Sequence, residues 1–133
     1  MGFMETIFTK IINKELPARI VYEDKLFIAF LDTNPNTKGH TILVPKQAAE
    51  SLRELPEKYV EALMPTAVKV AKILESKLYC RAFNFEINDG EFAGQEVMHV
   101  SMNIIPRYNK KERLIIRKNH NDNLDKVFDI IKN

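Results

Sequence analysis

The chain has 133 residues, of which 45% are apolar and 29% charged, a balance that suits one globular domain with its own core. A net charge of +2 argues against a dedicated nucleic-acid binder, which would usually be much more basic. The single cysteine, Cys80, excludes an intramolecular disulfide, and no apolar run is long enough to span a membrane. We therefore expect a cytoplasmic protein, with a nuclear pool compatible with the same features, and no nucleic-acid or membrane partner.

The first part of the chain predicts a short helix followed by three strands. Residues 6–13 place apolar side chains on one side of a helix. Residues 32–39 contain Asn, Pro, Thr and Gly and predict a loop. The three strands are expected at residues 20–22, 26–31 and 40–44.

The longest helical pattern follows Pro56, a residue that suits the first turn of a helix. Apolar residues then recur at helical spacing as far as Leu78. Pro65 lies inside this pattern. Because proline lacks an amide hydrogen and crowds the carbonyl four residues earlier, we expect a kink or a break there.

Two alternating segments, residues 82–88 and 97–105, predict two further strands. A final helix is expected over residues 124–131, with Asp122 as its N-terminal cap. Strands and helices without a regular strand–helix–strand rhythm predict an α+β fold with an antiparallel sheet. We expect residues 1–133 to form a single domain.

The segment from residue 97 to residue 105 carries the candidate chemistry. Alternation predicts that His99, Ser101 and Asn103 share one face of the strand, at steps of about 6.5 Å, with apolar residues on the other face. Before them, residues 94–97 form a turn whose backbone amides could approach a phosphate. An antiparallel strand with one solvated face has the same pattern, and the strand alone favours that simpler interpretation.

Residues 94–105 nevertheless resemble the signature of the histidine-triad (HIT) family, Gly-Gln-x-Val-x-His-x-His-x-His followed by two apolar residues. Four other segments resemble family motifs in the same order and spacing. They are the N-terminal helix at residues 7–12, the nucleoside-binding turn at 30–35, the strand ending in Pro-Lys at 39–46, and the Asn-x-Gly turn at 88–90. The resemblance covers about residues 6–107 and leaves 108–133 as a C-terminal extension.

The resemblance implies a five-stranded antiparallel sheet with two main helices, besides the C-terminal helix, and a homodimer. It also implies a site for a purine nucleotide such as AMP or GMP, related to the sites of nucleotidyl hydrolases and transferases. In such a site Asp32 would accept hydrogen bonds from the ribose hydroxyls. The other residues that it places around the nucleotide are Ile7, Phe8, Ile11, Phe30, Thr33, Asn88, Gln95, Glu96 and Val97. Any one of the apolar residues could equally be ordinary core.

The sequence departs from the family pattern at the centre of the motif. Ser101 replaces the histidine that attacks the phosphate, and Asn103 replaces a histidine that helps to hold it, while His99 and His40 remain. A serine hydroxyl is not nucleophilic until a base removes its proton, and asparagine brings no charge. We therefore expect nucleotide binding with catalysis lost or strongly reduced.

Two alternatives stay open. One is an active nucleoside phosphoramidate or dinucleoside polyphosphate hydrolase that uses another group, such as a water activated by His99. The other is a non-catalytic dimeric interaction protein with a vestigial cavity.

The resemblance also raises the question of a metal, because some bacterial relatives carry a structural zinc. The matching positions here are Thr6, Thr9, Ala48 and His99. Threonine and alanine do not ligate zinc, so we expect no metal and no cofactor. A basic stretch, residues 107–118, could contact phosphates or an acidic partner, although a solvated face is the interpretation that we favour.

Overall fold

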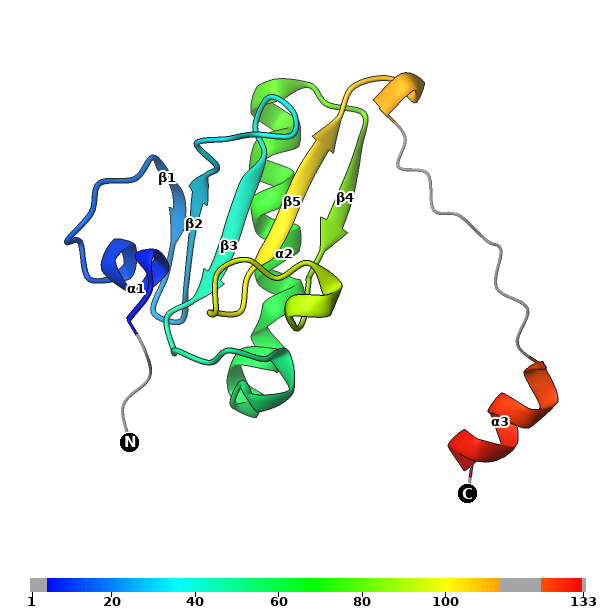
Figure 1. The fold of residues 1–133 in the computed structure, drawn as a ribbon. Coiled ribbons are helices and arrows are strands. Elements are labelled where there is room, and N and C mark those ends of the chain that lie inside the picture. Colours follow the sequence, from blue (N-terminus) through cyan, green and yellow to red (C-terminus); the bar gives the residue numbers. More distant parts are fainter. Residues whose placement is uncertain (1–4, 113–122, 133) are drawn as a thin grey trace.

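The computed structural model describes residues 5–112 and 123–132. In this part of the chain five strands form one antiparallel sheet in the order β1-β2-β3-β5-β4 (Figure 1). The strands are β1 (Ile20–Glu23), β2 (Phe27–Leu31), β3 (Thr41–Pro45), β4 (Ala82–Glu86) and β5 (Met102–Arg107). The helices are α1 (Ile7–Ile12), α2 (Glu57–Leu78) and α3 (Leu124–Lys132), with short 3-10 turns η1 (Leu52–Glu54), η2 (Glu91–Ala93) and η3 (Lys110–Glu112). The predicted α+β fold is confirmed.

The sheet separates two hydrophobic clusters. α2 lies behind the sheet in Figure 1 and packs its buried stripe against one face, whereas α1 covers part of the opposite face. Because side chains alternate along a strand, β3 contributes Leu43 to the α2 side and Ile42 and Val44 to the α1 side. α1 itself contributes Phe8 and Ile11. The short α1 leaves room on its face of the sheet for polar residues from β4 and β5.

α2 continues through Pro65 without the predicted break, over its whole length from Glu57 to Leu78. Pro65 is exposed, so the carbonyl that loses its hydrogen bond faces water rather than the core. The buried stripe includes Leu63, Val70 and Leu74, and each buried side chain of this kind stabilises the fold by roughly 1.5–3 kcal/mol. Together these residues outweigh a proline cost of about 3 kcal/mol.

The last strand begins later than the alternation predicted, because β5 starts at Met102 and residues 97–101 lie outside the ladder. His99 donates its backbone N–H to the Val97 carbonyl at 2.8 Å, which forms a tight turn. Val100 donates its N–H to the Ala49 carbonyl at 2.8 Å, well away from the neighbouring strands. The prediction of one regular strand from residue 97 is therefore wrong.

α3 begins after Asn123, whose side-chain oxygen accepts a hydrogen bond from the Lys126 N–H at 3.2 Å. Asp122, the predicted cap, lies outside the described residues. Every residue of α3 is exposed, including Leu124 and Phe128. Within the described parts of the chain, no helix combines the length and the apolar character that crossing a membrane requires.

Candidate functional site

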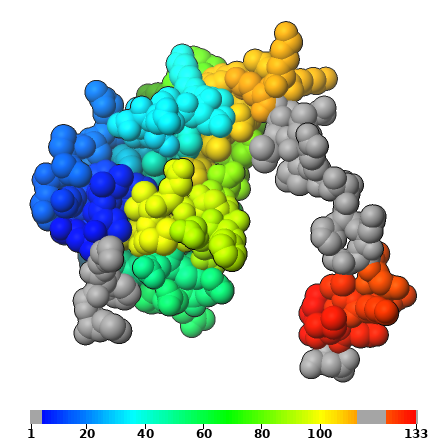
Figure 2. Space-filling model, viewed as in Figure 1, coloured from blue at the N-terminus to red at the C-terminus, as the bar shows by residue number. Residues whose placement is uncertain are grey.

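A cavity of about 230 Å³ lies where α1, the turn at residues 94–97 and the start of β5 meet. Figure 2 shows α1, in dark blue, directly beside this turn, in yellow. Its lining residues are Ile7, Phe8, Asp32, Ile42, Asn88, Gly94, Gln95, Glu96, Val97, Ser101 and Asn103. The structure thus brings together most of the residues predicted around a nucleotide, and it adds Ile42 and Gly94.

Five predicted site residues do not line the cavity: Ile11, Phe30, Thr33, His40 and His99. Ile11, on α1, and Phe30, on β2, are buried between this helix and the sheet, where the Phe30 ring meets the Phe8 ring edge to face at a centroid distance of 5.6 Å. Thr33 is exposed. Of the predicted apolar residues, Ile7, Phe8 and Val97 line the cavity, whereas Ile11 and Phe30 lie in the buried cluster on that face of the sheet.

α1 is positioned by a capping box at its first turn. The Thr6 hydroxyl accepts hydrogen bonds from the N–H groups of Phe8 (3.2 Å) and Thr9 (3.3 Å), and the Thr6 N–H donates to the Thr9 hydroxyl (3.1 Å). These bonds satisfy amide groups that a helix start otherwise leaves unpaired. Phe8 is consequently held against the sheet, while Ile7 stays 54% exposed at the cavity mouth.

Asp32 lies directly after β2 and points a carboxylate at the cavity. Its Oδ1 accepts a hydrogen bond from the Asn34 N–H at 2.8 Å, and its backbone N–H donates to the His40 carbonyl at 2.9 Å. The Asp32 side chain is 23% exposed, and its Oδ2 lies 3.7 Å from His40 Nε2. A carboxylate fixed in this way can accept hydrogen bonds from a pair of neighbouring hydroxyls.

His40 links the loop after β2 to β5 by hydrogen bonds at both ring nitrogens, and these bonds define its tautomer. The Asn36 N–H donates to His40 Nδ1 at 3.0 Å, so this nitrogen acts as the acceptor and the proton lies on Nε2. His40 Nε2 then donates to Asn103 Oδ1 at 2.8 Å. The Asn103 amide nitrogen is left as a neutral donor beside Glu86 Oε1, at 3.4 Å.

His99 is buried below the cavity rather than displayed in it, with 1% of its surface exposed. Its Nε2 lies 2.9 Å from the Pro45 carbonyl, and because a carbonyl only accepts, Nε2 carries a proton. Burial lowers the pKa of the His99 imidazole, and the bond to Pro45 opposes this shift only in part. The neutral ring packs edge to face on Phe8, at a centroid distance of 6.2 Å. His99 therefore supports the cavity wall.

The turn before β5 is pinned by one side chain, Gln95. Its Oε1 accepts from the Gly90 N–H at 2.8 Å, and its Nε2 donates to the carbonyls of Glu50 (2.7 Å) and Val97 (3.1 Å). The Gln95 amide is thus occupied by the backbone. What the turn offers a ligand is mainly its own backbone, and Gly94 adopts the positive φ of +97° that the turn requires.

The charge of the cavity is unusual for a phosphate site. Among the described residues, its lining contains two carboxylates, Asp32 and Glu96, and neither lysine nor arginine. The Ser101 hydroxyl has no hydrogen-bonded base within the described parts of the chain. Nothing in this geometry activates Ser101 as a nucleophile.

The sequence matches the HIT domain family over residues 13–110, which is most of the chain. The chain belongs to the HIT family. An uncharacterized HIT-like protein of Methanocaldococcus jannaschii is 42% identical over 127 residues, covering 95% of this chain and 98% of that protein. The adenosine 5'-monophosphoramidase of Saccharomyces cerevisiae is 36% identical over 110 residues, covering 83% of this chain and 67% of the yeast protein.

Solved structures agree with this membership. The crystal structure of a HIT family protein from Bacillus subtilis aligns with a TM-score of 0.84 and 34% identity, covering 95% of this chain and 94% of that chain. Nucleotide hydrolases and nucleotide binding occur in the family. This HIT protein shares their fold, and its segment next to the cavity reads His99-Val100-Ser101-Met102-Asn103.

Ile42 of this HIT protein could not be predicted as a cavity residue from its own segment. It pairs with Asn103 in the register of β3 and β5, so the two side chains lie on the same face of the sheet. That pairing joins segments about sixty residues apart, and only the alternation within each strand was available from the sequence. Gly94, in contrast, belonged to the predicted turn.

Proposed function

We propose that this HIT protein binds a purine nucleotide such as AMP or GMP and has lost most or all of the nucleotidyl hydrolysis of its enzymatic relatives. The observation that carries the proposal is a division within the cavity. One end combines an apolar wall with the fixed Asp32 carboxylate. The other end presents Ser101 and Asn103, which supply neither an activated nucleophile nor a positive charge.

The nucleoside end has what a base and a ribose need. Ile7 and Phe8 offer an apolar surface for a purine, and burying a flat ring there is favourable. The Asp32 carboxylate can accept hydrogen bonds from the two ribose hydroxyls. Its hydrogen bond from the backbone of its own loop leaves oxygen lone pairs available for them. These features support binding by contacts that do not involve the phosphate.

The phosphate end supports weak catalysis at most. Loss of a covalent nucleophile typically lowers turnover by a factor on the order of 10⁴ to 10⁶. Within residues 5–112 and 123–132 no base is hydrogen-bonded to Ser101, and the Asn103 donor is neutral and shared with Glu86. The turn backbone before β5 and the amide of Asn88 remain as phosphate contacts.

A working hydrolase that uses water activated by His99 is disfavoured by the same geometry. His99 is buried, and its Nε2 proton is directed at the Pro45 carbonyl. A general base must reach the proton that it removes, directly or through one water. His99 does not line the cavity from which such a water would attack.

A homodimer is part of the proposal. Val60, Met64 and Val68 lie at helical spacing on α2 and are 42%, 52% and 42% exposed, and Phe85 on the edge strand β4 is 42% exposed. An apolar helix stripe next to an open sheet edge is a surface that a second copy can cover. A dimer mass in light scattering at micromolar concentration is expected. A monomer mass would count against this part, and a cytoplasmic location is expected for either form.

Calorimetric titration tests the binding proposal, with AMP and GMP as ligands and UMP as a matched pyrimidine control. We expect at least one purine nucleotide to bind more tightly than UMP. Release of AMP from adenosine 5'-phosphoramidate, followed in the same preparation, should stay close to the uncatalysed rate. Efficient steady-state release of AMP would establish the hydrolase instead, and a failure of all three nucleotides to bind would favour the interaction protein.

A further inference from the structure

The loop between β2 and β3, residues 32–40, is joined to the distant end of β5 by side-chain hydrogen bonds. The Thr37 hydroxyl donates to the Pro106 carbonyl at 2.7 Å, and Arg107 Nη1 donates to Asn36 Oδ1 at 2.9 Å. The residues that these bonds join are about seventy positions apart in the sequence. Because much of the loop is exposed, contacts of this kind decide how closely its position is fixed.

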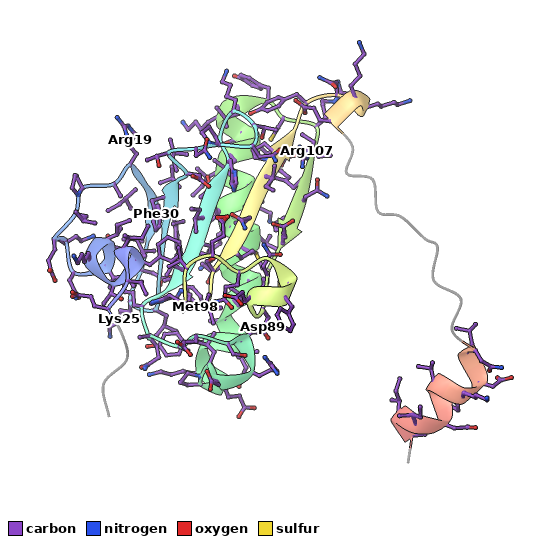
Figure 3. The ribbon with its side chains drawn as sticks, viewed as in Figure 1. Arg19, Lys25, Phe30, Asp89, Met98 and Arg107 are labelled. Atoms are coloured by element: carbon purple, nitrogen blue, oxygen red, sulfur yellow. The ribbon has the colours of Figure 1, made fainter. Side chains whose placement is uncertain are left out.

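Arg107 is suited to fixing the loop by the shape of its guanidinium. It follows Asn103 by four residues on β5, so both side chains lie on the face of the sheet that carries the nucleotide cavity. Its Nε donates to Asn84 Oδ1 on β4 at 2.8 Å, while its Nη1 holds Asn36 in the loop. Figure 3 labels Arg107 at this end of the sheet. The planar guanidinium thus bridges β4 and the loop with two directed bonds, which a lysine ammonium would not reproduce.

Asn36 connects this bridge to the nucleotide cavity. Its backbone N–H donates to His40 Nδ1 at 3.0 Å, which keeps the proton on Nε2, and His40 Nε2 donates to Asn103 Oδ1 at 2.8 Å. The His40 carbonyl accepts the Asp32 N–H at 2.9 Å. A continuous series of hydrogen bonds therefore runs from Arg107 to both Asp32 and Asn103, two residues that line the cavity.

We propose that Arg107 is a positioning residue for the nucleotide cavity, which holds the loop so that Asp32 faces the ribose and His40 keeps its tautomer. Arg107 does not line that cavity, so it acts through the loop and not on the ligand. Given the nucleotide binding proposed above, on which this inference rests, Arg107 orders the ribose end of the site.

The competing explanation is attraction by charge. Arg107 lines a second cavity, of about 590 Å³, together with Arg81 and Lys110, and this concentration of positive charge could attract a phosphate from a distance. The two explanations differ in the ligands that they affect. A positioning role concerns ligands with ribose hydroxyls, whereas charge attraction concerns every ligand with a phosphate.

Calorimetric titration with AMP and with 2',3'-dideoxyadenosine 5'-monophosphate separates the two explanations. Arg107→Gln should weaken AMP about three- to tenfold, the effect of losing an ordinary hydrogen bond, and should change the affinity for the dideoxy ligand by less than about twofold. Arg19→Gln is the control of equal charge, because Arg19 is exposed and precedes β1 at the opposite edge of the sheet (Figure 3). Equal weakening of both ligands by Arg107→Gln would show charge attraction and overturn the inference.

Asn36→Ala tests the same link from the loop side, at an exposed position where folding is not at risk. It removes the acceptor for Arg107 and keeps the backbone N–H that bonds to His40. It should weaken AMP, and the double variant with Arg107→Gln should be no weaker than Arg107→Gln alone, because both changes break one link. Asn34→Ala is the matched control, since Asn34 is exposed and gives Asp32 a backbone N–H that alanine retains. Additive losses in the double variant would contradict the link.

The ring nitrogens of His40 provide a readout that needs no nucleotide. Their chemical shifts should show a proton on Nε2 in the parent and in Arg19→Gln, and a mixture of the two tautomers in Arg107→Gln and Asn36→Ala. Unchanged His40 signals in a folded Arg107→Gln would overturn the inference whether or not AMP binds. A changed tautomer in a protein whose parent binds no nucleotide would support the ordering of the loop by Arg107 and defeat the proposed function alone.

Discussion

Asn103 and Arg107 point to the same face of β5 but into opposite electrostatic surroundings. Around Asn103 lie the carboxylates of Asp32 and Glu86, and the part of the chain that the structure describes contributes no lysine or arginine to the cavity there. About 13 Å further along the strand, Arg107 lies in a cavity with two other cations and no lining carboxylate. One strand thus carries an acidic end and a basic end.

The difference teaches where nucleotide affinity can come from. A phosphate at the Asn103 end meets neutral donors and nearby negative charge, so charge attraction contributes little there. In the proposed site, we therefore expect nucleotide affinity to come from the apolar wall and from Asp32. A cavity lined by Arg81, Arg107 and Lys110 lies at the other end of β5.

The largest expected effect comes from restoring imidazoles at the acidic end. Ser101→His combined with Asn103→His should raise hydrolysis of adenosine 5'-phosphoramidate by orders of magnitude, because a missing nucleophile costs on the order of 10⁴ to 10⁶. His40 already directs its Nε2 proton at position 103, where an imidazole nitrogen can accept it. Release of AMP is the measurement.

Asn103→His alone is the control for that experiment, since it restores the phosphate contact without the nucleophile. It should stay near the parent rate. If the double variant folds and binds AMP but gains no turnover, the two histidines alone are not sufficient for catalysis in this cavity. The groups that would orient them must then be missing as well.

The next effect concerns the nucleoside end. Asp32→Ala should weaken AMP by about 10- to 100-fold, corresponding to roughly 1.5–3 kcal/mol for hydrogen bonds to a charged group. Thr33→Ala is the matched control, because Thr33 is exposed and does not line the cavity. Calorimetry measures both variants. Unchanged affinity in Asp32→Ala would mean that the ribose does not bind where we place it.

The position of Asp32 in the fold follows from local sequence evidence. A polar loop directly after an apolar strand places its first side chain at the end of that strand, and in the structure Asp32 follows β2 directly and lines the cavity. The alternation of β4 was equally informative: Asn84 and Glu86 contact the polar partners Arg107 and Asn103 on β5. Local periodicity decides such features without knowledge of distant partners.

His99 could not be placed by the same reasoning. Its segment does not pair with the neighbouring strands, because the Val100 N–H donates to the carbonyl of Ala49, a residue about fifty positions away. The His99 side chain also forms a hydrogen bond with the Pro45 carbonyl. Pro65 failed as a break for a related reason, since the burial of α2 on the sheet outweighs one lost hydrogen bond. In each case a tertiary contact overrides a local preference.

A smaller effect is expected in the pH dependence of the free energy of unfolding, because His99 is buried whereas the cavity groups are not. Burial lowers the pKa of His99 below the unfolded value of about 6.5, so between these two pKa values the unfolded chain binds the extra proton. The free energy of unfolding should therefore fall as the pH is lowered from 7.5 through 6.5. The slope is at most about 1.4 kcal/mol per pH unit, and it ends below the folded pKa.

Urea unfolding of the parent and of His99→Gln at pH 7.5, 6.5 and 5.5 measures this slope. The variant should be less stable at pH 7.5 but should lose less stability on acidification. Equal slopes in the two proteins would show that His99 does not titrate as its burial implies.

The smallest effect tests the negative charge next to Asn103. Glu86→Gln should tighten AMP about two- to threefold, because it removes a carboxylate near the phosphate while keeping an amide oxygen for Asn103 and Asn88. Glu57→Gln, an exposed change of equal charge at the start of α2, should leave the affinity unchanged. Weaker binding in Glu86→Gln would mean that this carboxylate orients the donors more than it repels the ligand.

The central claim is that the cavity holds a nucleotide whose phosphate bond it does not break. A crystal of the parent protein soaked with adenosine 5'-phosphoramidate tests it most directly. We predict an intact ligand, with its purine against Phe8, its ribose hydroxyls on Asp32 and its phosphorus–nitrogen bond present beside Ser101. An adenylyl group on Ser101, or AMP in place of the phosphoramidate, would contradict the claim.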